Sequence, residues 1–206
     1  MRSAIIKLID LVLKFPILFE LQQKFFNNYT ALRVEYSSIF STNCELKILD
    51  IGCASGICAS SIVDLKRYTL VGIDLDKNYV TRAKRSFPNG CFLAMDANNL
   101  GFDEKSFDVV MFNSVLHHLG DDTIANSLFE VERVLRDGGR LLVAEPIFSE
   151  KRIISNLLLR FDRGKYVRRK DEYRDLLNRF DITHERNFEF RPHQFCSFVA
   201  QKKASG

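Results

Sequence analysis

Hydrophobic positions recur along the chain in two patterns, which predict a helical start followed by alternating strands and helices. Between residues 4 and 40, apolar residues repeat at spacings of three and four, as at Ile5, Leu8 and Ile9, which predicts amphipathic helix. Pro16 is expected to divide this segment into two or more helices. Further along, short apolar runs alternate with stretches of helical periodicity, which is typical of an α/β domain.

Seven strands are predicted in the remainder of the chain. The apolar runs that indicate them lie at 47–51, 68–73, 91–95, 107–112, 140–144, 183–190 and 195–201. Helices are expected between them, from the first strand to about residue 65, then at 76–87 and at 121–135, the last closed by Asp137-Gly138-Gly139. Strands alternating with helices predict a mainly parallel sheet covered on both faces. The last two strands lie so close in sequence that they should pair as an antiparallel hairpin at a sheet edge.

Composition and charge exclude several classes of protein. The 206 residues suffice for one ordinary domain, and 30 basic against 26 acidic residues give a net charge of +4, too small for a whole-chain nucleic-acid binder. No run approaches the roughly 20 uncharged apolar residues that a membrane span needs. Lys7, Asp10 and Lys14 interrupt the apolar N-terminal segment, so it does not suit a signal peptide. We therefore expect a cytoplasmic protein with no integral membrane segment.

The five cysteines indicate neither a disulfide framework nor a metal site. Their number is odd and no two form a C-x-x-C pair, so reduced thiols are expected, with no bound metal.

Acidic residues at predicted strand ends point to a ligand site, because open α/β sheets bind ligands at the carboxyl ends of their strands. Asp50 precedes a loop with glycines at Gly52 and Gly56, which allow a sharp turn and a close approach of the backbone. Asp74 closes the second strand and suits a carboxylate that accepts both hydroxyls of a ribose, although it could instead cap the next helix. Asp96 follows the third strand and suits an adenine edge.

The glycine loop argues against a dinucleotide. It lacks the G-x-G-x-x-G fingerprint, and Asp50 stands two residues before its first glycine. A nucleoside without a pyrophosphate needs less backbone to bind anions, and Asp50 can hold a cationic ammonium. A dinucleotide-dependent oxidoreductase is therefore disfavoured.

Residues 46–146 resemble the core of a class I S-adenosylmethionine-dependent methyltransferase. The matching segments follow the family's order and spacing: LKILDIGCASG, VGIDLD, AMDANNLGFDEKSFDVVMFNSVLHHL and LRDGGRLLVAEP. The resemblance implies a Rossmann-like, seven-stranded sheet with an antiparallel last strand, S-adenosylmethionine as cofactor, and methyl transfer. The flanks are similar to a narrower group of bacterial small-molecule methyltransferases with an N-terminal helical cap. This similarity implies a helical cap over residues 1–44 and a methyltransferase domain over residues 45–206.

The resemblance also assigns the cofactor-binding residues. The glycine loop lines the methionine part of the cofactor, the acid of the second strand binds the ribose, that of the third strand the adenine, and an asparagine after the fourth strand faces the sulfonium. The full set is Asp50, Gly52, Ala54, Gly56, Asp74, Leu75, Asp96, Ala97 and Asn113. Ala54 stands where the family often has glycine, so the loop is expected to be slightly less open.

Methyl transfer from a sulfonium is an in-line displacement that alignment and desolvation accelerate. It needs no covalent nucleophile, but a general base helps when the acceptor is a hydroxyl or a protonated amine. The candidate bases are His117, His118 and Glu145. Each also has a structural interpretation, since a histidine here can cap a helix or pack beneath the site and a strand-end acid can be solvated.

The acceptor is the least determined part of the prediction. Residues 151–174 hold nine basic and three acidic groups, a net of +6, which favours either an anionic small molecule or simply a solvated basic face. The candidate acceptor-binding residues are Tyr29, Arg33, Arg163, Tyr166 and Arg168; Tyr36 is a further residue through which a lid could reach the site. The N-terminal helix is interpreted as a lid rather than a peripheral membrane contact.

The two alternatives that share the cofactor motifs are an active methyltransferase and a module without catalysis. Transfer to oxygen or nitrogen of an anionic metabolite is preferred, with carbon also open. A cofactor-binding module without catalysis, acting as a partner or sensor, shares every cofactor motif. Nucleic acid is disfavoured as acceptor because the fourth strand ends in Asn113-Ser114-Val115-Leu116 rather than an N-P-P-aromatic motif. The sequence predicts neither the acceptor's identity nor an oligomeric state.

Overall fold

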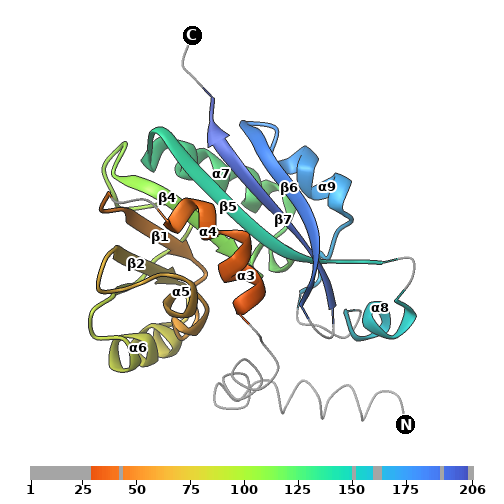
Figure 1. Ribbon diagram of the computed structural model, residues 1–206, viewed down its shortest axis with the longest axis horizontal. Coiled ribbons are helices and arrows are strands. Elements are labelled where there is room, and N and C mark those ends of the chain that lie inside the picture. Colours follow the sequence, from red (N-terminus) through yellow and green to blue (C-terminus); the bar gives the residue numbers. More distant parts are fainter. Residues whose placement is uncertain (1–28, 42–43, 150–151, 160–163, 191–192, 204–206) are drawn as a thin grey trace.

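A seven-stranded sheet forms the centre of the protein (Figure 1). The structure is a computed structural model that describes residues 29–41, 44–149, 152–159, 164–190 and 193–203. The strands run in the spatial order β3-β2-β1-β4-β5-β7-β6. Their bounds are β1 Lys47–Ile51, β2 Thr69–Asp74, β3 Cys91–Ala94, β4 Phe107–Asn113, β5 Leu135–Ile147, β6 Phe180–Phe190 and β7 His193–Lys202.

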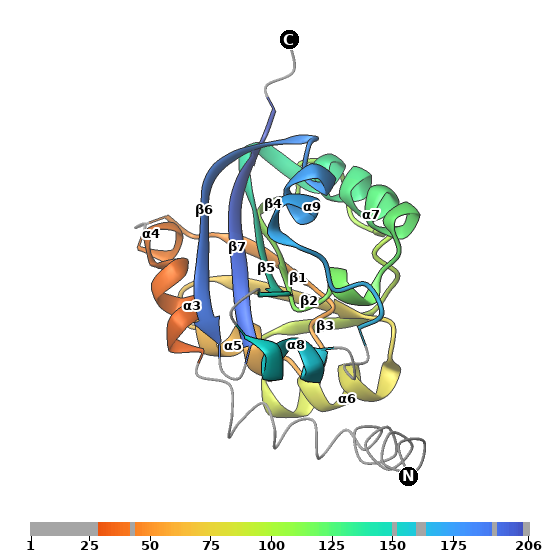
Figure 2. The ribbon, with the colours of Figure 1, turned by 90° about the vertical axis from the view of Figure 1, so that its right-hand side faces the viewer.

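Helices cover both faces of the sheet. Figure 2 shows α3 and α4 on one side and α7 and α9 on the other. The helices described are α3 Thr30–Glu35, α4 Ser37–Phe40, α5 Ile57–Ile62, α6 Lys77–Ser86, the short 3-10 helix η1 Leu116–His118, α7 Asp121–Val134, α8 Ile153–Leu159 and α9 Lys170–Leu176. Alternate strand residues enter two separate cores: Leu49 and Ile51 pack with α7 and α9, whereas Ile48 packs with α3, α5 and α6.

The sheet topology confirms the predicted fold class. β1 pairs in parallel with β2 and β4, and β3 and β5 extend the parallel pairing on either side. β7 pairs antiparallel with both β5 and β6, so the predicted hairpin lies at the sheet edge as expected. This arrangement is the Rossmann-like sheet with an antiparallel last strand.

The predicted helix stop at Asp137-Gly138-Gly139 is wrong. α7 ends at Val134 and the chain enters β5 directly at Leu135. The next residues bulge out of the sheet, since Leu135 pairs with Phe107 and Arg140 already pairs with Val109. Gly138 has a φ of 74° in this bulge, so the glycines turn a strand rather than end a helix.

Of the predicted N-terminal helical segment, the structure describes the part from Tyr29 onward, and Pro16 lies outside the described residues. Leu32, Tyr36 and Ile39 are buried and anchor α3 and α4 on the core to which α5 also contributes. Among the described residues, no helix has the length and apolar character needed to cross a bilayer.

Candidate functional site

The loop after β1 has the backbone shape that its sequence predicts. Gly52, Ala54 and Gly56 all have left-handed conformations, with φ of 72°, 45° and 77°. A side chain at Gly52 would place Cβ 2.6 Å from Cγ2 of Val115, so this position accepts only glycine. Ala54 adopts the left-handed conformation at a cost that glycine would avoid.

Asp74 ties this loop to the end of β2. Its Oδ2 accepts a 2.9 Å hydrogen bond from the amide of Ala54, and its Oδ1 accepts one of 2.9 Å from the amide of Asp76. The cap of α6 is Asp76, whose side chain accepts a bond from the amide of Asn78. The alternative role of helix cap therefore belongs to Asp76, and Asp74 orients the loop.

Asp50 carries a buried carboxyl group beside the loop, and only 2% of the residue is exposed to solvent. Burial, and then the negative charge of Asp74, raise its pKa to about 7, while the side chain of Asn113 opposes the shift. Such a group favours a cationic neighbour, because a positive charge would restore its ionised form.

Asp96 and Asn113 complete the row at the neighbouring strand ends. Asp96 is exposed after β3, and its Oδ1 accepts a 2.9 Å bond from the amide of Asn98. Ala97 is half-buried next to it, and Leu75, 70% exposed, lies just beyond β2. Asn113 is the last residue of β4. The sheet order thus places the predicted cofactor residues along the carboxyl ends of four adjacent strands.

The residues present fit S-adenosylmethionine. The left-handed loop brings backbone close to a ligand, and Asp50 offers a buried anion to its ammonium. Within the described structure, the buried hydroxyl of Ser55 in this loop has no hydrogen-bond partner, so a polar group is left for a ligand to satisfy.

Glu145 is anchored in the interior rather than exposed at a strand end. It is fully buried on β5, and its carboxylate accepts hydrogen bonds from the amides of Val115 (2.8 Å), Leu116 (2.7 Å) and His117 (3.3 Å). Its Oε2 also lies 2.6 Å from Nδ1 of His117. Both oxygens of Glu145 are therefore engaged by the turn after β4, and its role as a general base stays a prediction.

His117 is sealed from solvent by the segment Gly164–Arg168, here named the strap. His117 is 3% exposed, and its carbonyl accepts a 2.9 Å bond from the amide of Tyr166. A Cβ on Gly164 would lie 2.0 Å from Cδ2 of His117, so only glycine permits this packing. In this arrangement His117 packs against the strap, and its role as a general base stays a prediction.

Arg168 binds the protein itself. Its guanidinium donates to the carbonyls of Leu116 (3.1 Å) and Leu119 (3.0 Å) and pairs with Asp121. The other described basic residues nearby are also mostly paired: Arg169 with Asp171 and Glu172, and Lys170 and Arg174 with Glu185. Arg163 lies outside the described residues. The described part of the basic segment is therefore largely neutralised.

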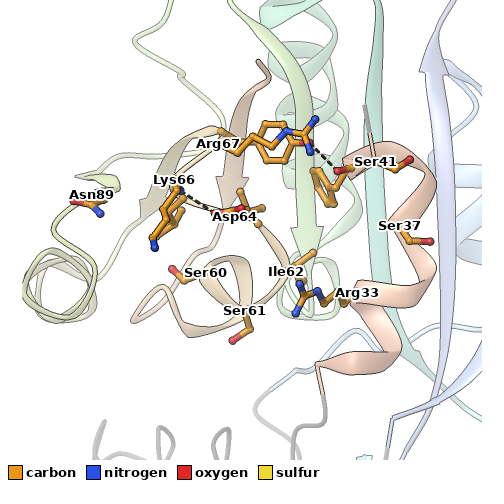
Figure 3. Close-up of a pocket in the computed structure, with 14 residues that line it drawn as sticks. Arg33, Ser37, Ser41, Ser60, Ser61, Ile62, Asp64, Lys66, Arg67 and Asn89 are labelled. Atoms are coloured by element: carbon orange, nitrogen blue, oxygen red, sulfur yellow. Dashed lines mark hydrogen bonds between the residues drawn. The ribbon is translucent and has the colours of Figure 1, made fainter. Parts of the chain in front are cut away.

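Of the residues predicted on the N-terminal cap, Tyr36 reaches the end of β4, whereas Arg33 and Tyr29 lie elsewhere. Arg33 lines a cavity of about 620 Å³ between α3, α4 and the segment from α5 to β2. Figure 3 shows it beside Ile62, with Arg67 and Lys66 farther along the wall. That cavity lies on the flank of the sheet, so the structure does not bring Arg33 to the strand ends. Tyr29 packs half-buried against the core, whereas the Tyr36 hydroxyl reaches Oδ1 of Asn113.

Sequence reasoning missed the packing of the strap and the conformation of Ser114. Ser114 has a φ of 59°, an unusual value for a residue other than glycine, directly after Asn113. No local pattern marks either feature, because both depend on contacts between segments far apart in sequence.

Cys53 and Cys196 are buried, Cys58 is half-buried, and Cys44 and Cys91 are exposed. Burial raises the pKa of the Cys53 and Cys58 thiols, so both stay protonated at neutral pH. All five cysteines are free thiols. Among the described residues, no three His, Cys, Asp or Glu side chains are grouped to hold a metal ion.

Comparison with known proteins finds similarity to methyltransferases over the middle of the chain. Residues 49–143 match the family model described as a methyltransferase domain. A demethylmenaquinone methyltransferase of Chlorobaculum tepidum is 30% identical over 115 residues, 56% of this chain and 47% of that protein. A ubiquinone/menaquinone biosynthesis C-methyltransferase of Campylobacter jejuni is 33% identical over 113 residues, 52% of this chain and 47% of that protein. The chain thus spans about half the length of these relatives.

The fold is shared with solved methyltransferase structures. A crystal structure of an S-adenosylmethionine-dependent methyltransferase from Methanosarcina mazei superposes with a TM-score of 0.67 at 21% identity, covering 81% of this chain and 96% of that one. The domain match, the strand order and the row of residues at the strand ends agree. Residues 49–143 therefore resemble a methyltransferase domain, and the chain shares its fold with a solved S-adenosylmethionine-dependent methyltransferase.

Proposed function

We propose that this protein transfers the methyl group of S-adenosylmethionine to an oxygen or nitrogen atom of a small molecule. The observation that carries the proposal is the hydrogen bond from the Ala54 amide to Asp74, which joins the glycine loop to the ribose-binding acid. The bonded pair faces the carboxyl ends of the strands, where ligands of this fold bind.

The chain's own residues divide the work of binding. Asp74 is proposed to accept hydrogen bonds from the ribose hydroxyls, and Asp50 to pair with the ammonium. The residues proposed to contact the adenine are Asp96, Ala97 and Leu75. When bound, the cofactor supplies a sulfonium methyl group that is already electrophilic. The protein aligns the acceptor and excludes water. The acceptor's lone pair forms the new bond to carbon as the carbon–sulfur bond breaks, and the acceptor's proton leaves to a base or to water.

The proposed proton acceptor is His118. Of the three predicted bases, it alone has an exposed side chain, while His117 and Glu145 are buried. Its ring centroid lies 4.1 Å from that of His117.

Among the described residues of the basic segment, Lys165 is the one that supports an anionic acceptor. Lys165 is exposed on the strap and makes no ion pair among the described residues, whereas its basic neighbours are paired within the protein. We keep an anionic metabolite as the proposed acceptor on this basis. Carbon is the second candidate atom, because the relative from Campylobacter jejuni is named as a C-methyltransferase.

Calorimetric titration with S-adenosylmethionine, S-adenosylhomocysteine and NAD tests the proposal. We expect micromolar binding of the first two and none of NAD. Asp74→Ala should weaken S-adenosylmethionine binding at least about tenfold, because a charged hydrogen bond contributes roughly 1.5–3 kcal/mol. Asp76→Ala is the matched control, since it removes a neighbouring carboxylate that only caps α6.

Unchanged affinity in Asp74→Ala would refute the proposed cofactor site. Binding of both sulfur nucleosides without turnover in the presence of a small-molecule extract would instead favour the non-catalytic module.

A further inference from the structure

The turn after β4, Ser114–Gly120, is hydrogen-bonded on two sides by charged side chains of the protein itself. From the interior, the buried carboxylate of Glu145 accepts three consecutive amides and the Nδ1 contact of His117. From the outside, the guanidinium of Arg168 donates to the carbonyls of Leu116 and Leu119.

Both charged side chains are largely buried, and each contacts more than one residue of the turn. Glu145 has no exposed surface, and the Arg168 side chain is 10% exposed. Hydrogen bonds to buried charges are among the strongest in proteins, so this turn has one defined shape. It needs such support, because Ser114 sits in the left-handed region with a φ of 59°.

The Ser114–Gly120 turn also packs against the glycine loop after β1. Val115, whose amide binds Glu145, packs against Gly52 so closely that a Cβ there would lie 2.6 Å from its Cγ2. On the preceding side, Ser114 follows Asn113, and its amide donates a 2.8 Å bond to the carbonyl of Ala144 beside Glu145. A shift of the turn would therefore move both Val115 and Asn113.

We infer that Glu145 and Arg168 are positioning residues for the cofactor site, acting through the Ser114–Gly120 turn rather than on the acceptor. The inference rests on the proposed function, since it assigns a role in cofactor binding. Glu145 holds the amides of the turn, Arg168 holds its carbonyls, and Val115 transmits that shape to the Gly52 loop.

The test measures S-adenosylmethionine affinity in Glu145→Gln and Arg168→Lys. Glutamine keeps the volume but offers one acceptor oxygen in place of two, and lysine loses the fork that spans two carbonyls. We expect affinity to fall about tenfold for the first variant and about threefold or more for the second. Glu185→Gln and Arg179→Lys are matched controls whose ion pairs lie away from the strand ends.

A second readout separates positioning from general stability. Hydrogen exchange should show faster exchange of the Val115, Leu116 and His117 amides in Glu145→Gln, with the amides of β1 and β2 unchanged. Leu128→Ala, a core truncation on the buried face of α7, serves as the control for lost stability. An affinity loss in Glu145→Gln no greater than in a Leu128→Ala protein of equal melting temperature would overturn the inference.

The outcomes distinguish this inference from the proposed function. Failure of the wild-type protein to bind either sulfur nucleoside would refute the proposed function. Normal wild-type binding that Arg168→Lys and Glu145→Gln leave intact would refute the positioning role alone. If Glu145→Gln does not fold, the conservative Arg168→Lys variant still decides the question.

Discussion

The hydroxyl of Tyr36, on the N-terminal cap, lies 3.3 Å from Oδ1 of Asn113 at the end of β4 and donates a hydrogen bond to it. Tyr36 is completely buried where α3 meets α4. Burial raises its pKa well above the ordinary value, so the hydroxyl keeps its proton and remains a donor. The position of the cap is thereby linked to a residue that is expected to face the cofactor.

Tyr36→Phe should weaken cofactor binding while the fold persists. The change removes one buried hydrogen bond, a loss of about 1 kcal/mol, and takes away the donor that Tyr36 offers to Oδ1 of Asn113. We expect S-adenosylmethionine affinity to fall about threefold to tenfold in calorimetry. Tyr68→Phe is the control, because the Tyr68 hydroxyl donates to the carbonyl of Phe40, away from the strand ends. Equal effects of the two variants on affinity would contradict the link.

Ala54→Gly should stabilise the protein. Ala54 has a φ of 45°, which costs an alanine roughly 1 kcal/mol and a glycine almost nothing. Part of this gain is offset by the greater freedom of glycine in the unfolded chain, so we expect an increase of about 0.5 kcal/mol in the free energy of unfolding. Denaturant unfolding measures it, and the hydrogen bond from the residue 54 amide to Asp74 should survive.

Ala59→Gly provides the opposite control, because Ala59 is buried within α5 and glycine there should destabilise by about 1 kcal/mol. If both variants lose stability to the same extent, the strain assigned to Ala54 is absent.

The features that could be predicted are those written into short stretches of sequence. The period of apolar residues located all seven strands, and the spacing of Gly52 and Gly56 beside Asp50 indicated the loop. The bulge at Gly138 was misread as a helix stop, because a glycine pair breaks either element and only pairing with β4 decides between them.

The supporting contacts could not be predicted, because they join distant segments. Glu145 lies 28 residues from His117 along the chain, and nothing local shows that its carboxylate turns inward. Arg168 stands in a basic run that suggested an anion, yet it binds carbonyls 52 and 49 residues away. Charge is visible in a sequence, whereas the partner that satisfies it depends on the fold.

Cofactor affinity should depend on pH through Asp50. Burial raises its pKa to about 7 from an ordinary value of 3.8, so the carboxyl is mostly protonated below neutrality and must ionise to pair with an ammonium. We expect the affinity for S-adenosylmethionine to rise about fivefold between pH 6 and pH 7, in proportion to the ionised fraction. Calorimetry across this range measures the effect.

The same group should make the unliganded protein less stable as pH rises. Between pH 3.8 and about 7 the folded state retains a proton that the unfolded state has released, so the contribution of Asp50 to stability falls across this window. Asp50→Asn should therefore unfold at a higher temperature than wild type at pH 7.5, yet bind the cofactor weakly with no dependence on this titration. A wild-type affinity that stays flat from pH 6 to pH 7 would contradict the coupling of binding to Asp50 ionisation, and an equal rise in Asp50→Asn would show that another group titrates.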